Sequence, residues 1–346
     1  MKIEEIAKTL KVSKSTVSLA INNKAGVSKS TREKVLLFVR DSGYISRTMV
    51  KSGQEHTFSK TIKLLICVRP EITTSENMIS SSFFMELIQG LEKKFSVLGF
   101  TLMFSSIDPS NFLEQIKKIE EEHTSIGVVL LGTSLGKEEI QIASQYIHNL
   151  VVLDTFFDFM NVNFVVMNNE KGGYDACSYL VNLGHQNIGY VQSPNRIGNF
   201  NFRKRGFIRA LEENNLNIPK KNFFTVRNEI NFAEKDFKEI ITNRFSSLPS
   251  ALFCENDYIA IGVIKALRKI GKKIPDDISV IGFDNVTESI IISPELTTID
   301  VKKSEMGALA AQRMYDIINT FGNSSIIINS IMNTSLIERK SCKPYK

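Results

Sequence analysis

Two short helical patterns open the chain. Apolar residues recur at helical spacing over Ile3–Leu10 and again over residues 17–21, and residues 11–13 separate the two patterns. Ser13 is placed to cap the second helix with its side-chain oxygen. The pattern therefore predicts two short helices joined by a three-residue turn.

A third apolar pattern, over residues 35–39, follows a loop that contains Gly26. Two start signals are open for its helix, Ser28 alone or the capping-box pair Ser30 and Glu33. Together the patterns predict a three-helix unit of the helix-turn-helix type. In such a unit the second helix enters the major groove of DNA, and its first side chains lie at the base edges. These side chains are Lys14 and Ser15, with Thr16, Ser18 and Asn22 placed for phosphates or flanking bases.

From Thr61 onward, short apolar runs typical of buried strands alternate with stretches of helical period, such as residues 84–98 and 258–270. This alternation predicts an α/β fold with parallel sheets that helices cover on both faces. The expected strands are residues 62–68, 102–105, 126–131, 151–153, 164–167, 188–191, 251–254 and 279–283.

The length of 346 residues favours two or three packed units. We expect the large α/β region to divide into two lobes near residues 159–163, with returns near 291–294 and 321–325 that make three crossovers. Ligands bind such folds at the carboxyl ends of the strands, which here means the cleft between the lobes. The expected units are a headpiece at 1–44, a hinge and linker at 45–60, and a large domain at 61–346, with lobe 1 at about 61–160 and 292–322 and lobe 2 at about 161–291 and 323–340.

Charge is divided unevenly along the chain. The formal net charge is +6, but residues 1–60 hold 12 of the 43 Lys and Arg residues and only 5 of the 37 Asp and Glu residues. The remaining residues therefore carry slightly more acid than base. Such a basic unit attracts phosphates and releases counterions, so this charge favours nucleic acid as the partner of the headpiece.

Several classes of protein lack support in the sequence. The apolar runs are too short to cross a bilayer, and the first residues carry acid where a signal peptide needs an apolar stretch, so we expect a cytoplasmic protein without a membrane partner. The four cysteines form no Cys-x-x-Cys pair and the four histidines no metal-ligand spacing. No phosphate-binding glycine loop or serine elbow occurs. We therefore expect no catalysis, metal or cofactor.

The polar residues between the apolar positions of the headpiece resemble those of the lactose/galactose repressor (LacI/GalR) family of bacterial transcriptional regulators. The resemblance continues through the large domain in order and spacing. The headpiece residues that carry it are Ile3-x-x-Ile6-Ala7, Val12-Ser13-x-Ser15-Thr16-Val17-Ser18-x-Ala20-Ile21-Asn22, Val27-Ser28-x-x-Thr31-Arg32-x-x-Val35 and Gly43-Tyr44. Those of the large domain include Gly172-Gly173, Leu183-Gly184-His185, Arg203-x-x-Gly206-Phe207, Asn256-Asp257, Gly282-Phe283-Asp284-Asn285 and Pro294-x-Leu296-Thr297-Thr298.

The resemblance implies a sequence-specific repressor that binds double-stranded operator DNA and works as a homodimer through its large domain. It also implies a large domain folded like the periplasmic sugar-binding proteins, with a small effector between the lobes. A secreted solute-binding protein would share this large fold, but it would need a signal peptide and has no use for a basic headpiece.

Two positions of the headpiece depart from the family pattern. The family usually has a basic or hydrogen-bonding residue before Ala20, whereas this chain has Leu19, which cannot donate to a base edge. Contact with a thymine methyl group and simple packing are both open for Leu19. The leucine that wedges into the minor groove in relatives falls at Gly53 by register. Either Met49 or Val50 substitutes one turn earlier, or this protein bends its operator less. The expected DNA-binding residues are Ser13, Lys14, Ser15, Thr16, Ser18, Leu19, Asn22, Lys24, Arg47, Met49 and Val50.

The resemblance also implies an effector clamp made by Arg203 and Asp284, because a fork of donors and a two-oxygen acceptor suit vicinal hydroxyls, or a carboxylate bridged by water. A purely structural pair of a helix-start arginine with a carboxylate is the alternative. Phe83 and Phe84 follow the first strand, where relatives offer an aromatic face; core packing competes for Phe84, which favours Phe83. Asn256 opens a helix, where capping and ligand contact are both open. The full set is Phe83, Phe84, Thr155, Asn199, Asn201, Arg203, Asn256 and Asp284.

Aromatic and amide groups with one arginine and one aspartate favour a sugar or related polyol over a polyanion. A purine-like corepressor and a phosphorylated carrier protein remain as alternative controls of the same fold. Whether the ligand releases or strengthens operator binding does not follow from the sequence, since either sign uses the same scaffold.

Overall fold

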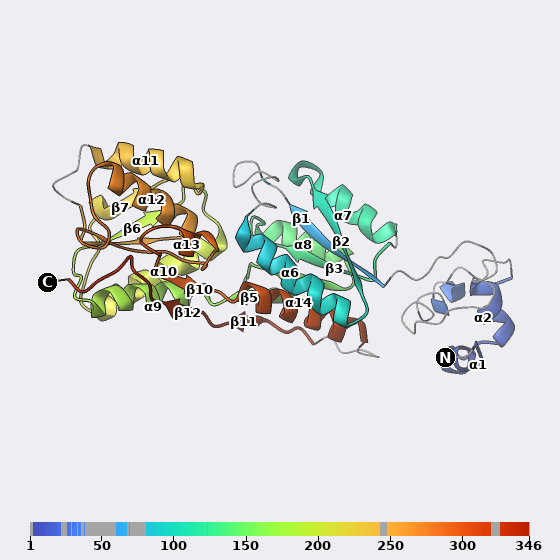
Figure 1. Cartoon of the computed structure of the whole chain (residues 1–346). Coiled ribbons are helices and arrows are strands. Elements are labelled where there is room, and N and C mark those ends of the chain that lie inside the picture. The colour runs from blue at the N-terminus through green and yellow to red at the C-terminus, as the bar shows by residue number, and fades with distance from the viewer. Residues whose placement is uncertain are drawn as a thin grey trace.

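The computed structural model describes residues 3–21, 26–28, 30–32, 34, 35, 38, 60–67, 69, 81–122, 124–242, 248–319 and 326–345. These residues form a small helical headpiece and a large domain of two lobes. Each lobe is built on its own parallel sheet, and Figure 1 shows the two lobes side by side, joined by the chain around β5, β10, β11 and β12.

The headpiece begins with α1 (Ile3–Leu10) and α2 (Lys14–Ile21). The hydroxyl of Ser13 accepts a hydrogen bond from the backbone N–H of Thr16 at 3.0 Å, which confirms the predicted cap. Ser28 makes the same bond to the N–H of Thr31 at 3.2 Å, so the first of the two start signals is in use. The headpiece core consists of Ile6, Ala7, Val17, Ala20 and Val35.

Lobe 1 is a six-stranded parallel sheet in the order β11-β5-β4-β3-β1-β2. Separate apolar cores lie against its two faces, because the residues of β1, β3, β4 and β5 are buried on both sides. The strands are β1 (Thr61–Cys67), β2 (Thr101–Ile107), β3 (Gly127–Leu131), β4 (Leu150–Leu153), β5 (Asn163–Met167) and β11 (Ser330–Met332). The helices are α6 (Ser82–Val97), α7 (Phe112–Glu121), α8 (Lys137–Tyr146) and α14 (Lys303–Asn319), with the 3-10 turn η1 (Pro109–Asn111).

Lobe 2 is a four-stranded parallel sheet in the order β7-β6-β8-β9. Helices α9 and α10 pack together, and α11 packs on α12. The strands are β6 (Ile188–Gln192), β7 (Phe223–Thr225), β8 (Ala251–Cys254) and β9 (Ser279–Ile281). The helices are α9 (Asn169–Asn182), α10 (Gly198–Glu213), α11 (Ile230–Thr242), α12 (Asp257–Lys269) and α13 (Glu288–Ile291), with the 3-10 turn η2 (Lys220–Asn222).

The chain crosses between the lobes three times, but all three crossings lie elsewhere than expected. The N–H groups of Gly282 and Asp284 donate to the carbonyl oxygens of Thr297 and Ile299, so residues 297–300 extend lobe 2 and the second crossing follows Asp300, not residues 291–294. Strand β5 pairs with β4, and β11 pairs with β5, so both belong to the sheet of lobe 1. The first crossing therefore follows Met167, not residues 159–163, and the last follows Met332, not residues 321–325. Strand β5 is buried along its whole length, and an apolar run of this kind does not reveal which of two sheets it joins. At the crossings, β10 (Thr298–Asp300) pairs antiparallel with β12 (Ser335–Ile337).

Candidate functional site

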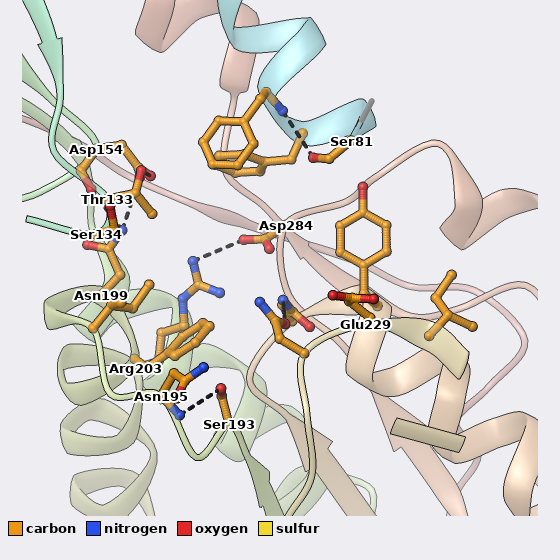
Figure 2. A pocket seen from close by; sticks show the side chains of 18 of the residues that line it. Ser81, Thr133, Ser134, Asp154, Ser193, Asn195, Asn199, Arg203, Glu229 and Asp284 are labelled. Carbon is orange, nitrogen blue, oxygen red and sulfur yellow. Dashed lines mark hydrogen bonds and ion pairs between the residues drawn. The ribbon is translucent and has the colours of Figure 1, made fainter. Parts of the chain in front are cut away.

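A cavity of about 310 Å³ lies between the lobes, at the carboxyl ends of both sheets. Lobe 1 contributes the start of α6 and the loops after β3 and β4, and lobe 2 contributes the loops after β6, β8 and β9 and the start of α10. Figure 2 shows Asp154, Thr133 and Asn199 on one side, Arg203 reaching toward Asp284 in the middle, and Glu229 on the far side. The position matches the cleft expected from the fold.

Arg203 holds the centre of the cavity. Its side chain is only 3% exposed, and its Nη2 lies 3.0 Å from Oδ1 of Asp284. Its Nε donates to Oδ1 of Asn169 at 2.9 Å, its Nη1 donates to the carbonyl oxygen of Glu255, and its guanidinium lies 3.8 Å from the ring centroid of Phe283. The fork is therefore held in one orientation by charge, hydrogen bonds and stacking.

Close packing of α9 on α10 brings Arg203 to this position. A Cβ atom at Gly173 of α9 would lie 2.1 Å from the backbone oxygen of Arg203. Only glycine leaves room for the two helices at this distance. The Gly172-Gly173 pair that resembles the family motif thus places the arginine.

Asp284 is the acceptor half of the clamp. Its backbone has φ +108°, and Nζ of Lys303, at the start of α14, donates to the carbonyl oxygens of Asp284 and Asn285 at 2.8 Å each. Burial raises the pKa of Asp284, and the charges of Arg203 and Lys303 lower it. Its Oδ1 makes the ion pair with Arg203 but receives no well-aligned hydrogen bond from the described residues. This oxygen is buried, and Arg203 is its ionic partner.

Both expected aromatic residues border the cavity, but Phe84, not Phe83, is the more exposed of the two. Phe83 packs into the core of lobe 1, whereas Phe84 is half-buried, and the two rings meet edge to face with centroids 5.1 Å apart. The expectation that favoured Phe83 is wrong on exposure, because the turn of α6 directs Phe83 inward. Phe84 offers the larger free apolar surface.

Asn199 and Asn256 border the cavity, while Asn201 and Thr155 do not. Asn256 also caps α12, since its Oδ1 accepts from the N–H of Ile259 at 2.9 Å, so capping and a place at the cavity wall occur together. Asn201 and Thr155 were expected to contact the effector, and the structure places neither at the cavity wall. Asn201 lies two residues beyond Asn199 on α10, which turns its side chain to solvent, and Thr155 is buried.

Several residues that the sequence pattern did not single out also border the cavity, among them Asp154, Tyr258, Glu229 and Glu288. Asp154 follows β4 as Asp284 follows β9, so the rule that ligands bind at strand ends could have found Asp154, whereas Asp284 was found through the family resemblance. Burial raises the pKa of Asp154 to about 7, although the hydrogen bond from Thr133 and the charge of Arg203 both lower it. Glu288 accepts a hydrogen bond from Ser82 of lobe 1 at 2.6 Å.

A buried carboxylate fixes the loop after β6. Glu255 accepts hydrogen bonds from Nη1 of Arg196, from the hydroxyl of Tyr190 at 2.8 Å and from the backbone N–H of Ser193 at 2.7 Å. Burial raises the pKa of Glu255 and Arg196 lowers it. This network holds the Ser193–Asn199 side of the cavity in place. Nothing in the sequence pattern marked it.

In the headpiece, the expected DNA-binding residues from Ser13 to Leu19 lie on or next to α2. Lys14 and Ser15 are exposed, Thr16 and Ser18 are half-exposed, and Nζ of Lys14 lies 2.6 Å from Oε1 of Glu4. Leu19 is half-buried, and its side chain lies near Gly26. The other expected residues, Asn22, Lys24, Arg47, Met49 and Val50, together with Gly53, lie outside the described residues.

Comparisons with known proteins agree with this architecture. Residues 2–46 match the family described as bacterial regulatory proteins, lacI family, and residues 177–342 match the periplasmic binding protein-like domain. The chain is 29% identical over 347 residues to the HTH-type transcriptional repressor PurR of Pasteurella multocida, covering 99% of this chain and 98% of that protein.

Solved structures show the same fold. A LacI family transcriptional regulator from Enterococcus faecium with bound ribose is 25% identical, with a TM-score of 0.68 over 83% of this chain and all of that one. The lac repressor dimer bound to operator and the anti-inducer ONPF is 21% identical, with a TM-score of 0.69 over 99% of both chains.

Among the described helices, none is long and apolar enough to span a membrane. The chain therefore belongs to the lactose/galactose repressor (LacI/GalR) family of bacterial transcriptional regulators, with a lacI-type DNA-binding domain followed by a periplasmic-binding-protein-like effector domain.

Proposed function

We propose that this protein is a repressor whose operator affinity is controlled by a neutral sugar or related polyol bound in the cavity between the lobes. The observation that carries the proposal is the clamp of Arg203 and Asp284 inside that cavity. A guanidinium donates along two parallel directions and a carboxylate accepts along two, which matches adjacent hydroxyl groups.

The charge of the cavity wall argues against an anionic effector. Among the described residues that line the cavity, Arg203 has the one cationic side chain, and Asp284 already balances its charge. Three further carboxyl groups, those of Asp154, Glu229 and Glu288, border the same space. A carboxylate or phosphate ligand would meet repulsion without a spare cation, whereas hydroxyl groups can donate to these oxygens.

The other walls suit a small ring with polar edges. Phe84 presents an apolar ring surface, and Asn195, Asn199, Asn228 and Asn231 present amides that both donate and accept. The volume of about 310 Å³ is at the small end for ligand pockets, as expected for a monosaccharide-sized molecule. The bound ribose of the Enterococcus faecium regulator supports this class of ligand.

A purine-like corepressor is the second candidate. The half-buried ring of Phe84 would stack on a flat base, and the asparagine amides would pair with its edges. This candidate uses the aromatic wall and the amides but leaves the clamp without vicinal hydroxyls to grip.

DNA binding rests on the headpiece. We infer that two headpieces of a homodimer engage the two half-sites of an operator, with Lys14 and Ser15 at the base edges and Ser13, Thr16 and Ser18 at phosphates. Leu19 offers a methyl-rich surface that suits a thymine methyl group instead of a hydrogen bond.

Isothermal titration calorimetry tests the effector class. The probes are neutral pentoses and hexoses, the uronic acids and 6-phosphates of the same hexoses, and free nucleobases. We expect binding only among the neutral sugars, followed by a change in operator affinity with the sugar that binds. If a nucleobase binds and no sugar does, the effector is a purine-like corepressor, the second candidate. If no small molecule binds and a phosphorylated carrier protein changes operator affinity, the pocket proposal is wrong.

A further inference from the structure

Behind the clamp, a chain of buried amides connects Arg203 with the lobe 1 wall of the cavity. Nε of Arg203 donates to Oδ1 of Asn169, and Nδ2 of Asn169 donates to Oδ1 of Asn199 at 3.0 Å. Nδ2 of Asn199 then donates to both Oδ1 and the backbone oxygen of Asp154, at 3.0 Å each. The hydroxyl of Thr133 donates to the other carboxylate oxygen of Asp154.

The donors of Arg203, Asn169 and Asn199 all point the same way, toward Asp154, whereas Thr133 donates to Asp154 from the opposite end. Each asparagine receives a hydrogen bond on its oxygen and passes one on from its nitrogen, so neither amide can turn over without breaking both bonds. Asn169, Asn199, Arg203 and Asp154 are each at most 4% exposed. At this depth water does not replace a lost partner, and hydrogen bonds in series strengthen one another.

The chain of amides also crosses the boundary between the lobes. Arg203 and Asn199 belong to α10 of lobe 2, and Asp154 and Thr133 follow β4 and β3 of lobe 1. Asn169 is the first residue of α9, directly after the first crossing, and its Nδ2 also donates to the carbonyl oxygen of Met167 at 3.3 Å. Asn169 does not border the cavity.

We propose that Asn169 and Asn199 form an amide relay that couples the grip of Arg203 on the effector to the position of lobe 1, with Asn169 as a positioning residue that never touches the ligand. The effector part of this inference rests on the proposed function. The coupling itself is a property of the ligand-free chain.

The coupling has a physical basis, because one continuous series of hydrogen bonds connects Arg203 with Asp154 across the boundary between the lobes. When ligand hydroxyls draw the oriented guanidinium of Arg203 toward them by a small displacement, the bond from its Nε to Oδ1 of Asn169 lengthens. The buried amides then regain their partners only if Asn199 and Asp154 shift together. A change at the cavity thus favours a different arrangement of the lobes, which is the kind of two-state element that allostery requires.

The chain offers a closely matched control in Asn222. Asn222 is a buried asparagine of lobe 2, 1% exposed, whose Nδ2 donates to an asparagine oxygen, that of Asn187, and to a backbone carbonyl, that of Ile188. Asn169 has the same two kinds of acceptor. Asn222 lies away from the cavity and the boundary, so Asn222→Ala reports the cost of losing such an amide without the relay.

Hydrogen–deuterium exchange of the full chain without effector is the first test. We expect Asn169→Ala to speed exchange in the peptide covering residues 150–156 of lobe 1 by about fivefold or more, while Asn222→Ala leaves this peptide unchanged. Equal exchange there in the two variants would overturn the relay. This arm does not depend on any ligand.

Asn169→Asp is the second test and keeps the side-chain size. The aspartate still accepts from Nε of Arg203 but has no donor for Asn199. With the sugar that binds the wild type, we expect affinity within about threefold of wild type but a loss of about tenfold in the ratio of operator Kd values with and without sugar. An unchanged ratio would contradict the relay. If the wild type binds no sugar, the proposed function fails, and the exchange experiment still decides the relay.

Discussion

Single residues in the cleft are held by more contacts than ligand binding alone requires. Arg203 makes its ion pair with Asp284 and hydrogen bonds to Asn169 and Glu255 within the protein itself. A guanidinium that is already oriented loses little freedom when it binds. The clamp is therefore preorganised, and its removal affects binding more than folding of the headpiece.

We predict that Arg203→Ala abolishes the effector response and leaves operator binding within about threefold of wild type. Arg203→Lys keeps the charge but not the fork, so we expect at least about a tenfold loss of sugar affinity. Calorimetry and fluorescence anisotropy measure the two quantities. Arg209→Ala, on the exposed face of the same helix, is the control. Unchanged sugar affinity in Arg203→Ala would refute the clamp.

Lys303 supports the other half of the clamp from lobe 1. Its two hydrogen bonds hold the left-handed backbone of Asp284 and Asn285. We predict that Lys303→Met lowers sugar affinity by about tenfold, since bonds to a charged donor are stronger than average. Lys302→Met is the matched control, because Lys302 is half-exposed and pairs with Asp300. If the two changes lower sugar affinity equally, Lys303 has no specific part in holding Asp284 for the ligand.

The buried carboxyl groups predict an unusual pH dependence. Burial raises the pKa of Asp257 to about 8, despite hydrogen bonds from Thr298 and Val286. Between pH 4 and 8 the folded state then holds a proton that the unfolded chain has released, so the stability contribution of this group falls as pH rises.

We predict that Asp257→Asn reduces this loss of stability between pH 4 and 8, because the amide cannot ionise and the hydroxyl of Thr298 can turn to accept from it. Urea denaturation at a series of pH values measures the effect. Asp276→Asn, at an exposed salt bridge with Lys343, is the control. The same slope in Asp257→Asn and wild type would show that another group titrates.

At the scale of elements, apolar periodicity predicted the central strands and the helices α6 and α12 close to their observed places, because burial on both faces leaves a plain signal. It missed β7, β10, β11 and β12, each three residues long, which are too short for a period. The family resemblance gave Arg203 and Asp284 as site residues, and Asn199 and Asn256 were expected in the same cleft. Asn169 gave no signal, since its role depends on the contact of α9 with α10.

The second helix carries a prediction of its own. Lys14 pairs with Glu4 of α1, and this contact lowers the pKa of Glu4. Phosphates must compete with that carboxylate for the ammonium group. We predict that Glu4→Gln strengthens operator binding by about two- to threefold at low salt, with Glu5→Gln as the control. Anisotropy titrations over a range of salt concentrations measure the change, and no difference between the two variants would contradict it.

At the scale of the whole molecule, positive charge and the effector cavity lie in separate units. The excess of Lys and Arg belongs to residues 1–60, whereas the cavity belongs to the large domain. We predict that a chain lacking residues 1–60 loses DNA binding but keeps sugar affinity, and that operator affinity of the full chain falls steeply with salt. Duplex binding by the shortened chain equal to that of the full chain would show the headpiece assignment to be wrong.

The three crossings have a consequence for synthesis. Lobe 1 completes its sheet only with β11, and lobe 2 anchors its β9 through a hydrogen bond from the N–H of Val280 to the backbone oxygen of Ser341. Neither lobe is a continuous stretch of chain, so neither is finished while the ribosome still holds the last strands. A growing chain therefore exposes an open edge on β5 until residues 330–332 emerge, and this edge is where chaperones would be most needed.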